Sequence, residues 1–582
     1  MKSIRIYLTL ILIAAAAASV QAQKKPVEVP LRFDRYYTYE EVNEALVALN
    51  KAYPKLTQLV MVGKSEEGRE IWSITVNNPA TGPEEGKPAL YLDGNIHGNE
   101  VQASEVCLYY VNYILTNYGK LERVTETVDR SVLYCIPTVN VDGRYHWFAD
   151  AATSSSGRGL RIPKDDDRDG LFDEDPAEDL DGDGNITQMR IRDTLGDMKT
   201  DPKDPRLMIR VEPGQKGEFR IVGSEGIDND NDGRTNEDEP GYVDPNRNFP
   251  YNWQPNYVQS GAGSYPLEGK GLKAIADYLY ARKNILVAWA FHNSGGMILR
   301  GPTSKSAQEY DRRDLEVFDY LGKEGEKIVP GYNYLVSWKD LYTTWGDFGD
   351  FTDDVVGAFT LVGELFQSNT ESYRTDTTRP ATSEERSTER IKFNDNLTNG
   401  QMYSNWKPYK HPLYGDVEIG GWSKFSSRLP QPFMLMDLVH RNAMAVFVCA
   451  YNMPKIEMQV YEQEQIGKDL YRVKVRLVNK KAVSSITAQS VRLKINPMDY
   501  LKVTGADSKV VAGGPVTDPF RNEASYKQYQ PEIQFLQLGS YGKAEYQFLI
   551  SGKGKIKIEY RSAKAGDVTK EVKLGVGQKP AG

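Results

Sequence analysis

Two of the five histidines in this 582-residue chain stand in surroundings that suit a metal ion. His97 lies in HGNE, three residues before Glu100, and His292 ends the apolar run ILVAWAFH. Two imidazoles and one carboxylate, with a fourth position left to water, form a catalytic zinc pattern. His97, Glu100 and His292 are therefore candidate zinc ligands, although HxxE alone is a common spacing.

A second carboxylate completes this chemistry. Glu364 ends the apolar run AFTLVGELF, as His292 ends its own run. Polar residues at the carboxyl ends of strands lie where α/β sheets bind ligands. A carboxylate there can take a proton from zinc-activated water and return it to the leaving group.

The elements that position these residues alternate between helix and strand from Lys25 to about Pro454. Helical spacing occurs at 39–53, 101–118 and 272–280, and apolar strands are expected at 89–92, 132–138, 285–291 and 358–362. This alternation predicts an α/β fold with a mixed, largely parallel sheet flanked by helices.

The pattern changes to period-two alternation after Pro454. Strands are expected at 471–477, 491–495, 546–550, 556–560 and 568–574, between Gly-rich turns. We therefore predict an all-β sandwich domain over 455–582. Its sequence has no ligand or nucleophile spacing, and its partner stays unknown.

The acidic excess behind the net charge of −8 is concentrated in two short segments. Residues 164–183 carry −9 and residues 228–239 carry −5. Without a basic excess, a generic nucleic-acid binder is not expected.

These acidic segments, in an insert at about 160–240, repeat DxDxDG from Asp165 and Asp228, and a third copy, DLDGDG, begins at Asp179. Alternating carboxylates followed by Gly suit Ca²⁺, whereas a solvated acidic loop is the simpler alternative. The candidate calcium ligands are Asp165, Asp167, Asp169, Asp228, Asp230, Asp232 and Glu239.

Residues 1–22 combine two basic residues, an apolar run and a small-x-small ending, which is typical of a secretory signal peptide. We expect a secreted or periplasmic protein with no transmembrane segment. The three cysteines lie in apolar sequence and are expected to be buried thiols.

Four motifs occur in the order found in one enzyme family: HGNE, DPNRNFPYNW, AFHNSGG and TLVGELF. Together with LYTTWGDFGDFTDDVVGAFTLVGE, they make residues 36–451 resemble the zinc metallocarboxypeptidases of the carboxypeptidase A/B type. The resemblance implies a catalytic domain over 23–454 with a zinc carboxypeptidase-like fold.

The resemblance also implies roles for individual residues. His97, Glu100 and His292 would hold Zn²⁺, and Glu364 would be the general base and later the acid. Substrate binding would fall to Asn246, Arg247 and Tyr342, and Arg190 in MRIR would stabilise the oxyanion. Gly349, at a position that helps to select the terminal side chain in the family, leaves that preference open.

The expected function is that of an exported zinc carboxypeptidase, which hydrolyses the C-terminal bond of peptides or proteins. One alternative is a carboxypeptidase or amidase that uses the same site on cell-wall stem peptides. Another is an inactive protein that binds a partner in the presence of calcium.

Overall fold

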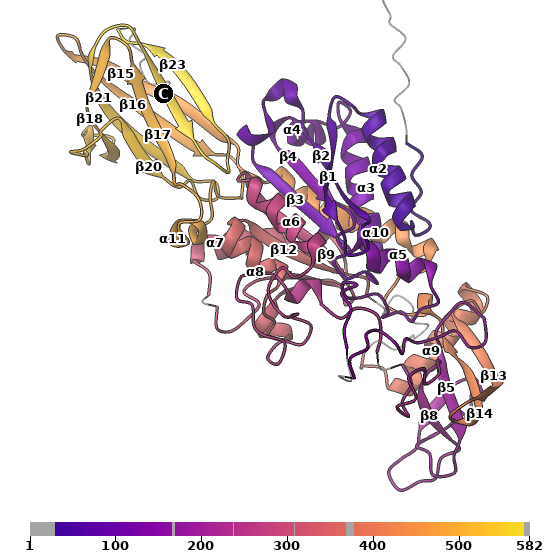
Figure 1. Ribbon diagram of the computed structural model, residues 1–582. Coiled ribbons are helices and arrows are strands. Elements are labelled where there is room, and N and C mark those ends of the chain that lie inside the picture. The colour runs from indigo at the N-terminus through magenta and orange to yellow at the C-terminus, as the bar shows by residue number, and fades with distance from the viewer. Residues whose placement is uncertain (1–28, 166–168, 237, 308, 368–377, 576–582) are drawn as a thin grey trace, which may run out of the picture.

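The computed structural model describes residues 29–165, 169–236, 238–307, 309–367 and 378–575. The expected signal peptide, residues 1–22, lies outside these residues. Figure 1 shows three parts: a central α/β body, a C-terminal β domain on one side, and a smaller sheet on the other.

The central body is built on an eight-stranded mixed sheet, in the order β1-β2-β4-β3-β9-β12-β10-β11. Strands β4, β3, β9 and β12 run parallel to one another, and the edges contain antiparallel pairs. The expected mixed, largely parallel sheet is therefore present. The strands are β1 (Thr57–Lys64), β2 (Glu70–Val76), β3 (Ala89–Gly94), β4 (Val132–Ile136), β9 (Ile285–Asn293), β10 (Met297–Arg300), β11 (Asn333–Val336) and β12 (Phe359–Leu365).

Helices cover both faces of this sheet because its central strands are apolar on both sides. Leu90 and Leu92 of β3 join one buried cluster, whereas Ala89 and Tyr91 join the other. Alternate side chains of a strand point to opposite faces, so each face needs its own helical layer. The helices are α2 (Tyr39–Ala52), α3 (Gln102–Asn117), α4 (Glu122–Arg130), α5 (Val141–Ala149), α6 (Lys270–Ala281), α7 (Arg312–Ile328), α8 (Phe348–Phe351) and α10 (Pro432–Tyr451).

Helix α10 packs against α3 and α7. Among the described residues it is the one helix long and apolar enough to cross a membrane, and half of that stretch is buried within the protein. The three cysteines are buried free thiols, as expected.

The smaller part contains a six-stranded sheet that joins two distant segments. Strand β14 pairs with β5 through Glu418 and Arg190, so the acidic insert and the segment before α10 form one sheet. Its members are β5 (Gln188–Arg192), β6 (Met198–Thr200), β7 (Met208–Arg210), β8 (Phe219–Ser224), β13 (Tyr403–His411) and β14 (Gly415–Trp422), with α9 (Ser383–Leu397) close by.

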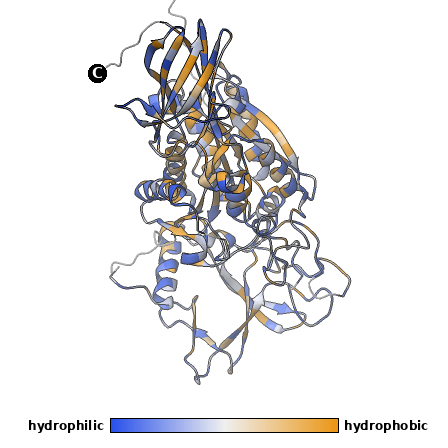
Figure 2. Cartoon of the chain, turned by 90° about the vertical axis from the view of Figure 1, so that its left-hand side faces the viewer, coloured by the Kyte–Doolittle hydropathy of each residue, from blue (hydrophilic) through white to orange (hydrophobic). Residues whose placement is uncertain are grey.

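The C-terminal part consists of two antiparallel sheets that share one core, as expected for a sandwich. Figure 2 shows hydrophobic and hydrophilic residues mixed along its strands. The expected strand at 491–495 is wrong, because Thr487 caps a short helix there, α11 (Ala488–Leu493). The strands are β15 (Ile456–Gly467), β16 (Leu470–Asn479), β17 (Asp499–Gly505), β18 (Ser508–Asp518), β19 (Glu523–Ala524), β20 (Ile533–Leu536), β21 (Lys543–Gly552), β22 (Lys555–Arg561) and β23 (Val568–Lys573).

Candidate functional site

The loop between β3 and α3 carries His97 and Glu100, and buried neighbours fix its conformation. Arg144, which is fully buried, donates hydrogen bonds to Asn95 Oδ1 and to the Val101 carbonyl, at 3.1 and 2.7 Å. A side chain at position 98 would lie 2.2 Å from the Gly157 carbonyl oxygen, so only glycine fits there. The loop therefore has little freedom to move its two metal-ligand candidates.

His292 and Glu364 reach the same place from the sheet. They occupy paired positions on the neighbouring parallel strands β9 and β12. Parallel strands end at the same edge, so the two side chains and the HGNE loop meet at the carboxyl edge of the sheet.

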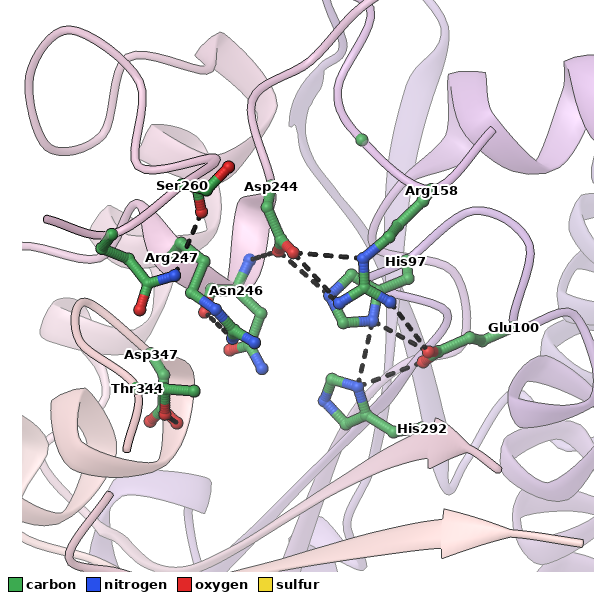
Figure 3. A network of polar contacts seen from close by, with 12 residues as sticks. His97, Glu100, Arg158, Asp244, Asn246, Arg247, Ser260, His292, Thr344 and Asp347 are labelled. Carbon is green, nitrogen blue, oxygen red and sulfur yellow. Dashed lines mark hydrogen bonds and ion pairs between the residues drawn. The ribbon is translucent and has the colours of Figure 1, made fainter. Parts of the chain in front are cut away.

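The three zinc-ligand candidates converge at short distances (Figure 3). His97 Nδ1 lies 3.0 Å from Glu100 Oε1, and His292 Nδ1 lies 3.1 Å from Glu100 Oε2. The two Nδ1 atoms are 3.3 Å apart. All three side chains are buried, and this arrangement of donor atoms fits a single ion.

The electrostatics of the site favour a charged Glu100. Burial alone would raise its pKa, but His97 and His292 hold the pKa of Glu100 below its usual range. Burial raises the pKa of Glu364; His292 opposes that rise, and Glu100 adds to it. Two carboxylates in one pocket thus have pKa values shifted in opposite directions, as expected when one is a ligand and the other a base.

Asp244 and Arg158 lie at Nε2 of His97, and neither residue is predicted from the sequence. Asp244 Oδ1 lies 3.0 Å from His97 Nε2, and Arg158 donates to Asp244 Oδ2 at 3.0 Å. Arg158 also lies 3.6 Å from Glu100. The signal for Asp244 was available, since it stands two residues before Asn246 in DPNRN, whereas Arg158 lies in the unremarkable SSSGRG.

The predicted substrate-binding residues line the same pocket, which has a volume of about 260 Å³. Asn246 Oδ1 accepts a hydrogen bond from the Phe348 N–H at 2.8 Å, and Arg247 lies beside it. Tyr342 is 63% exposed at the pocket's mouth, and Gly349 forms part of the wall. His146, His411 and His440 are not among the lining residues.

The expectation for Arg190 is corrected. Its guanidinium donates to Glu418 at 2.7 Å and packs against Phe219 and Trp406 in the six-stranded sheet. It does not line the pocket, whereas Arg158 does. The physical reason is that MRIR forms β5, which pairs with β14 and β8 in the six-stranded sheet and so keeps Arg190 within that sheet.

Arg428 is a further pocket residue that no motif predicted. It follows the six-stranded sheet in the chain and reaches the metal-ligand candidates, with one guanidinium nitrogen 3.4 Å from Glu100. The same nitrogen donates to the Asn293 carbonyl at 2.8 Å.

The acidic repeats form loops of one design. The N–H of the sixth residue donates to the first aspartate in three places: Gly170 to Asp165, Gly184 to Asp179, and Gly233 to Asp228. Carboxylates gather in the loops formed by Asp179, Asp181 and Asp183, and by Asp228, Asp230 and Asp232. Glu239 is not part of either group, and Asp167 lies outside the described residues.

Comparisons with known proteins bear on two parts of the chain. A family model described as zinc carboxypeptidase matches residues 42–165, and a domain of unknown function matches 455–573. Human carboxypeptidase D is 34% identical over 135 residues, or 23% of this chain and 10% of that protein. Carboxypeptidase B of Astacus astacus is 31% identical over 115 residues, or 20% of this chain and 36% of that protein.

Two solved structures are similar at low identity. Thrombin activatable fibrinolysis inhibitor has a TM-score of 0.45 at 16% identity, covering 74% of this chain and 77% of that one. Carboxypeptidase A of Helicoverpa armigera has a TM-score of 0.44 at 16% identity, covering 77% of this chain and 81% of that one.

The chain spans only about a tenth to a third of the length of the curated relatives named above. Over residues 42–165, which contain His97 and Glu100, the family model and the relatives confirm that this chain resembles the zinc carboxypeptidases.

Proposed function

We propose that this protein is an exported zinc carboxypeptidase that removes the last residue of peptides or proteins. The single observation that carries the proposal is one pocket shared by a His-Glu-His set, a separate carboxylate and an arginine able to bind a chain end. The export rests on residues 1–22 of the sequence alone.

His97, Glu100 and His292 would hold the zinc ion. When bound, Zn²⁺ supplies a Lewis acid that polarises a carbonyl and acidifies water. If His97 donates its Nε2–H to Asp244, its Nδ1 lone pair is free for a metal on the side of Glu100 and His292. The donor set and its support by Asp244 therefore fit this metal.

Glu364 is the proposed general base and acid. It accepts a proton from the attacking water and later donates that proton to the departing amine. A carboxylate suits this task when its pKa is raised towards neutrality, and the burial of Glu364 acts in that direction.

Two arginines would have separate roles, one in substrate binding and one in stabilising the oxyanion. Arg247 and Asn246 would bind the substrate's terminal carboxylate, because a guanidinium can donate two parallel hydrogen bonds to it. Arg158 would stabilise the oxyanion, since it lines the pocket next to Glu100. Tyr342, at the mouth, would close over the bound chain end.

The test is mass spectrometric mapping of the products that the purified full chain releases from a mixed peptide library. Loss of single C-terminal residues, abolished by a zinc chelator and restored by zinc, is the expected result. Internal cleavage, or no cleavage with zinc bound, would contradict the proposal. Diaminopimelate-containing peptides in the library separate a cell-wall substrate from ordinary peptides.

We also propose that the acidic loops bind structural Ca²⁺. The support is the common loop design, in which the carboxylates of Asp228, Asp230 and Asp232 lie close together. Calcium should protect residues 160–240 from proteolysis, and a calcium-selective chelator should expose them before zinc is lost. Equal protease resistance with and without calcium would count against this role.

A further inference from the structure

The C-terminal β domain contacts the central body in several places, and one of them is the turn 354–357, the end of a π-helical segment that leads into β12. Figure 1 shows α11 at this junction, near α7 and α8. Four side chains of the C-terminal domain bind the turn, and all four are buried: Gln489, Ser490, Asn496 and Lys564.

Two of these side chains donate hydrogen bonds to one backbone carbonyl of the turn, that of Val356. Lys564 Nζ donates to the Val356 carbonyl at 2.8 Å and also to the Ile285 carbonyl. Asn496 Nδ2 donates to the same Val356 oxygen at 3.3 Å. Every residue has a backbone carbonyl, so these contacts depend on the conformation of the turn and not on the identity of its side chains.

The turn is also shaped to accept the other domain. Gly357 has a φ of +77°, and a β-carbon there would lie 2.0 Å from Ser490 Oγ. Only glycine allows this conformation and this close approach. Next to it, Gln489 Nε2 donates to Asp354 Oδ1.

α11 is itself fixed to the central body. Asp314 of α7 accepts hydrogen bonds from the Ala488 and Gln489 N–H groups, at 2.8 and 2.9 Å. The contacts of Gln489 and Ser490 with the turn are therefore made by a helix that is itself bound to α7.

The turn continues directly into the wall of the proposed substrate pocket. The preceding segment contains Phe348, whose N–H holds Asn246, and Asp350, which accepts two hydrogen bonds from pocket residue Thr303. Asp353 holds the N–H of Thr360, another pocket residue. A shift of residues 354–357 would thus displace groups that contact the terminal residue of a substrate.

We propose that the C-terminal domain is an internal brace that positions the 347–357 segment, and through it the pocket for the substrate's terminal residue. The part of this inference that concerns substrate rests on the proposed carboxypeptidase function. Gln489, Ser490, Asn496 and Lys564 are positioning residues in this scheme, because they act on substrate through the turn.

The test uses the full chain with Asn496→Ala, which removes one contact to the Val356 carbonyl. Losing one such bond should raise amide hydrogen exchange in 352–357 by about three- to tenfold. KM for C-terminal peptides should rise by a similar factor, with kcat and zinc content unchanged. The matched control is Lys455→Ala, which removes an interdomain ion pair with Glu126 (2.9 Å) away from the turn.

Unchanged exchange and KM in a folded Asn496→Ala protein would overturn the brace, and so would equal effects in the Lys455→Ala control. If Asn496→Ala does not fold, Gln489→Ala provides the same two readouts. Failure of the wild-type chain to hydrolyse any peptide would overturn the proposed function instead, and the exchange experiment would still decide the brace.

Discussion

His97 and Asp244 form a contact that holds one of the metal-ligand candidates from behind: Asp244 Oδ1 lies 3.0 Å from His97 Nε2, whereas Glu100 lies at Nδ1. A carboxylate that accepts from Nε2–H holds an imidazole in the tautomer whose Nδ1 can bind a metal. Arg158 in turn holds Asp244 through its second oxygen, at 3.0 Å.

Replacing Asp244 should therefore weaken zinc binding without removing a ligand. For Asp244→Ala we expect zinc affinity to fall by about 10- to 100-fold, measured by competition with a chromogenic chelator. The control is Asp150→Ala, which removes a carboxylate 2.6 Å from Nδ1 of His146, outside the pocket. Equal zinc affinity in wild type and Asp244→Ala would refute this role.

Glu364→Gln tests the general base, because it keeps the shape of the side chain and removes its ability to accept a proton. We expect the turnover of peptides to drop by about 10²- to 10⁴-fold, with zinc retained in elemental analysis. A variant that cleaves at the normal rate would show that Glu364 does not move the proton.

Arg158 and Arg190 make a matched pair for the oxyanion role. Arg158→Ala should lower kcat by about 10²- to 10³-fold, because Arg158 lines the pocket beside Glu100. Arg190→Ala should leave kcat unchanged and lower the melting temperature instead, since it loses the pair with Glu418 and the packing on Trp406. The reverse pattern in steady-state kinetics would return the role to Arg190.

The candidate zinc ligands could be predicted because their signals are local. HGNE is a short motif, and the runs before His292 and Glu364 are apolar enough to read as buried strands. The sheet then brings the three segments together at its carboxyl edge. The same logic gave the long helix over 101–118, which is α3.

The position of Arg190 could not be predicted because its surroundings are set by the pairing of two distant strands. Strand β5 finds its partner β14 more than 220 residues later, and this pairing takes Arg190 out of the site. Arg428 enters the site for the same reason, at the end of the segment that supplies β14. The apolar alternation at 491–495 predicts a strand, but Thr487 caps the helix α11 there by accepting a hydrogen bond from the Ser490 N–H.

Lys564 should make stability depend on pH, since it is completely buried between the C-terminal domain and the central body. Burial lowers the pKa of Lys564 to about 7. Between pH 7 and the ordinary lysine pKa, the unfolded chain holds a proton that the folded chain has released. The free energy of unfolding therefore rises with pH across this window, by at most about 1.4 kcal/mol per pH unit.

The measurement is urea unfolding at pH 7 and pH 9 of the wild type and Lys564→Met. Methionine has no titratable group, so other ionisations cancel when the two proteins are compared. Lys564→Met should be less stable at both pH values, because two buried carbonyls lose their donor. The wild type should gain about 2 kcal/mol more than the variant between pH 7 and pH 9. An equal gain in both proteins would mean that Lys564 keeps its proton in the folded state, and that the two carbonyls are bound by an ammonium group rather than by a neutral amine.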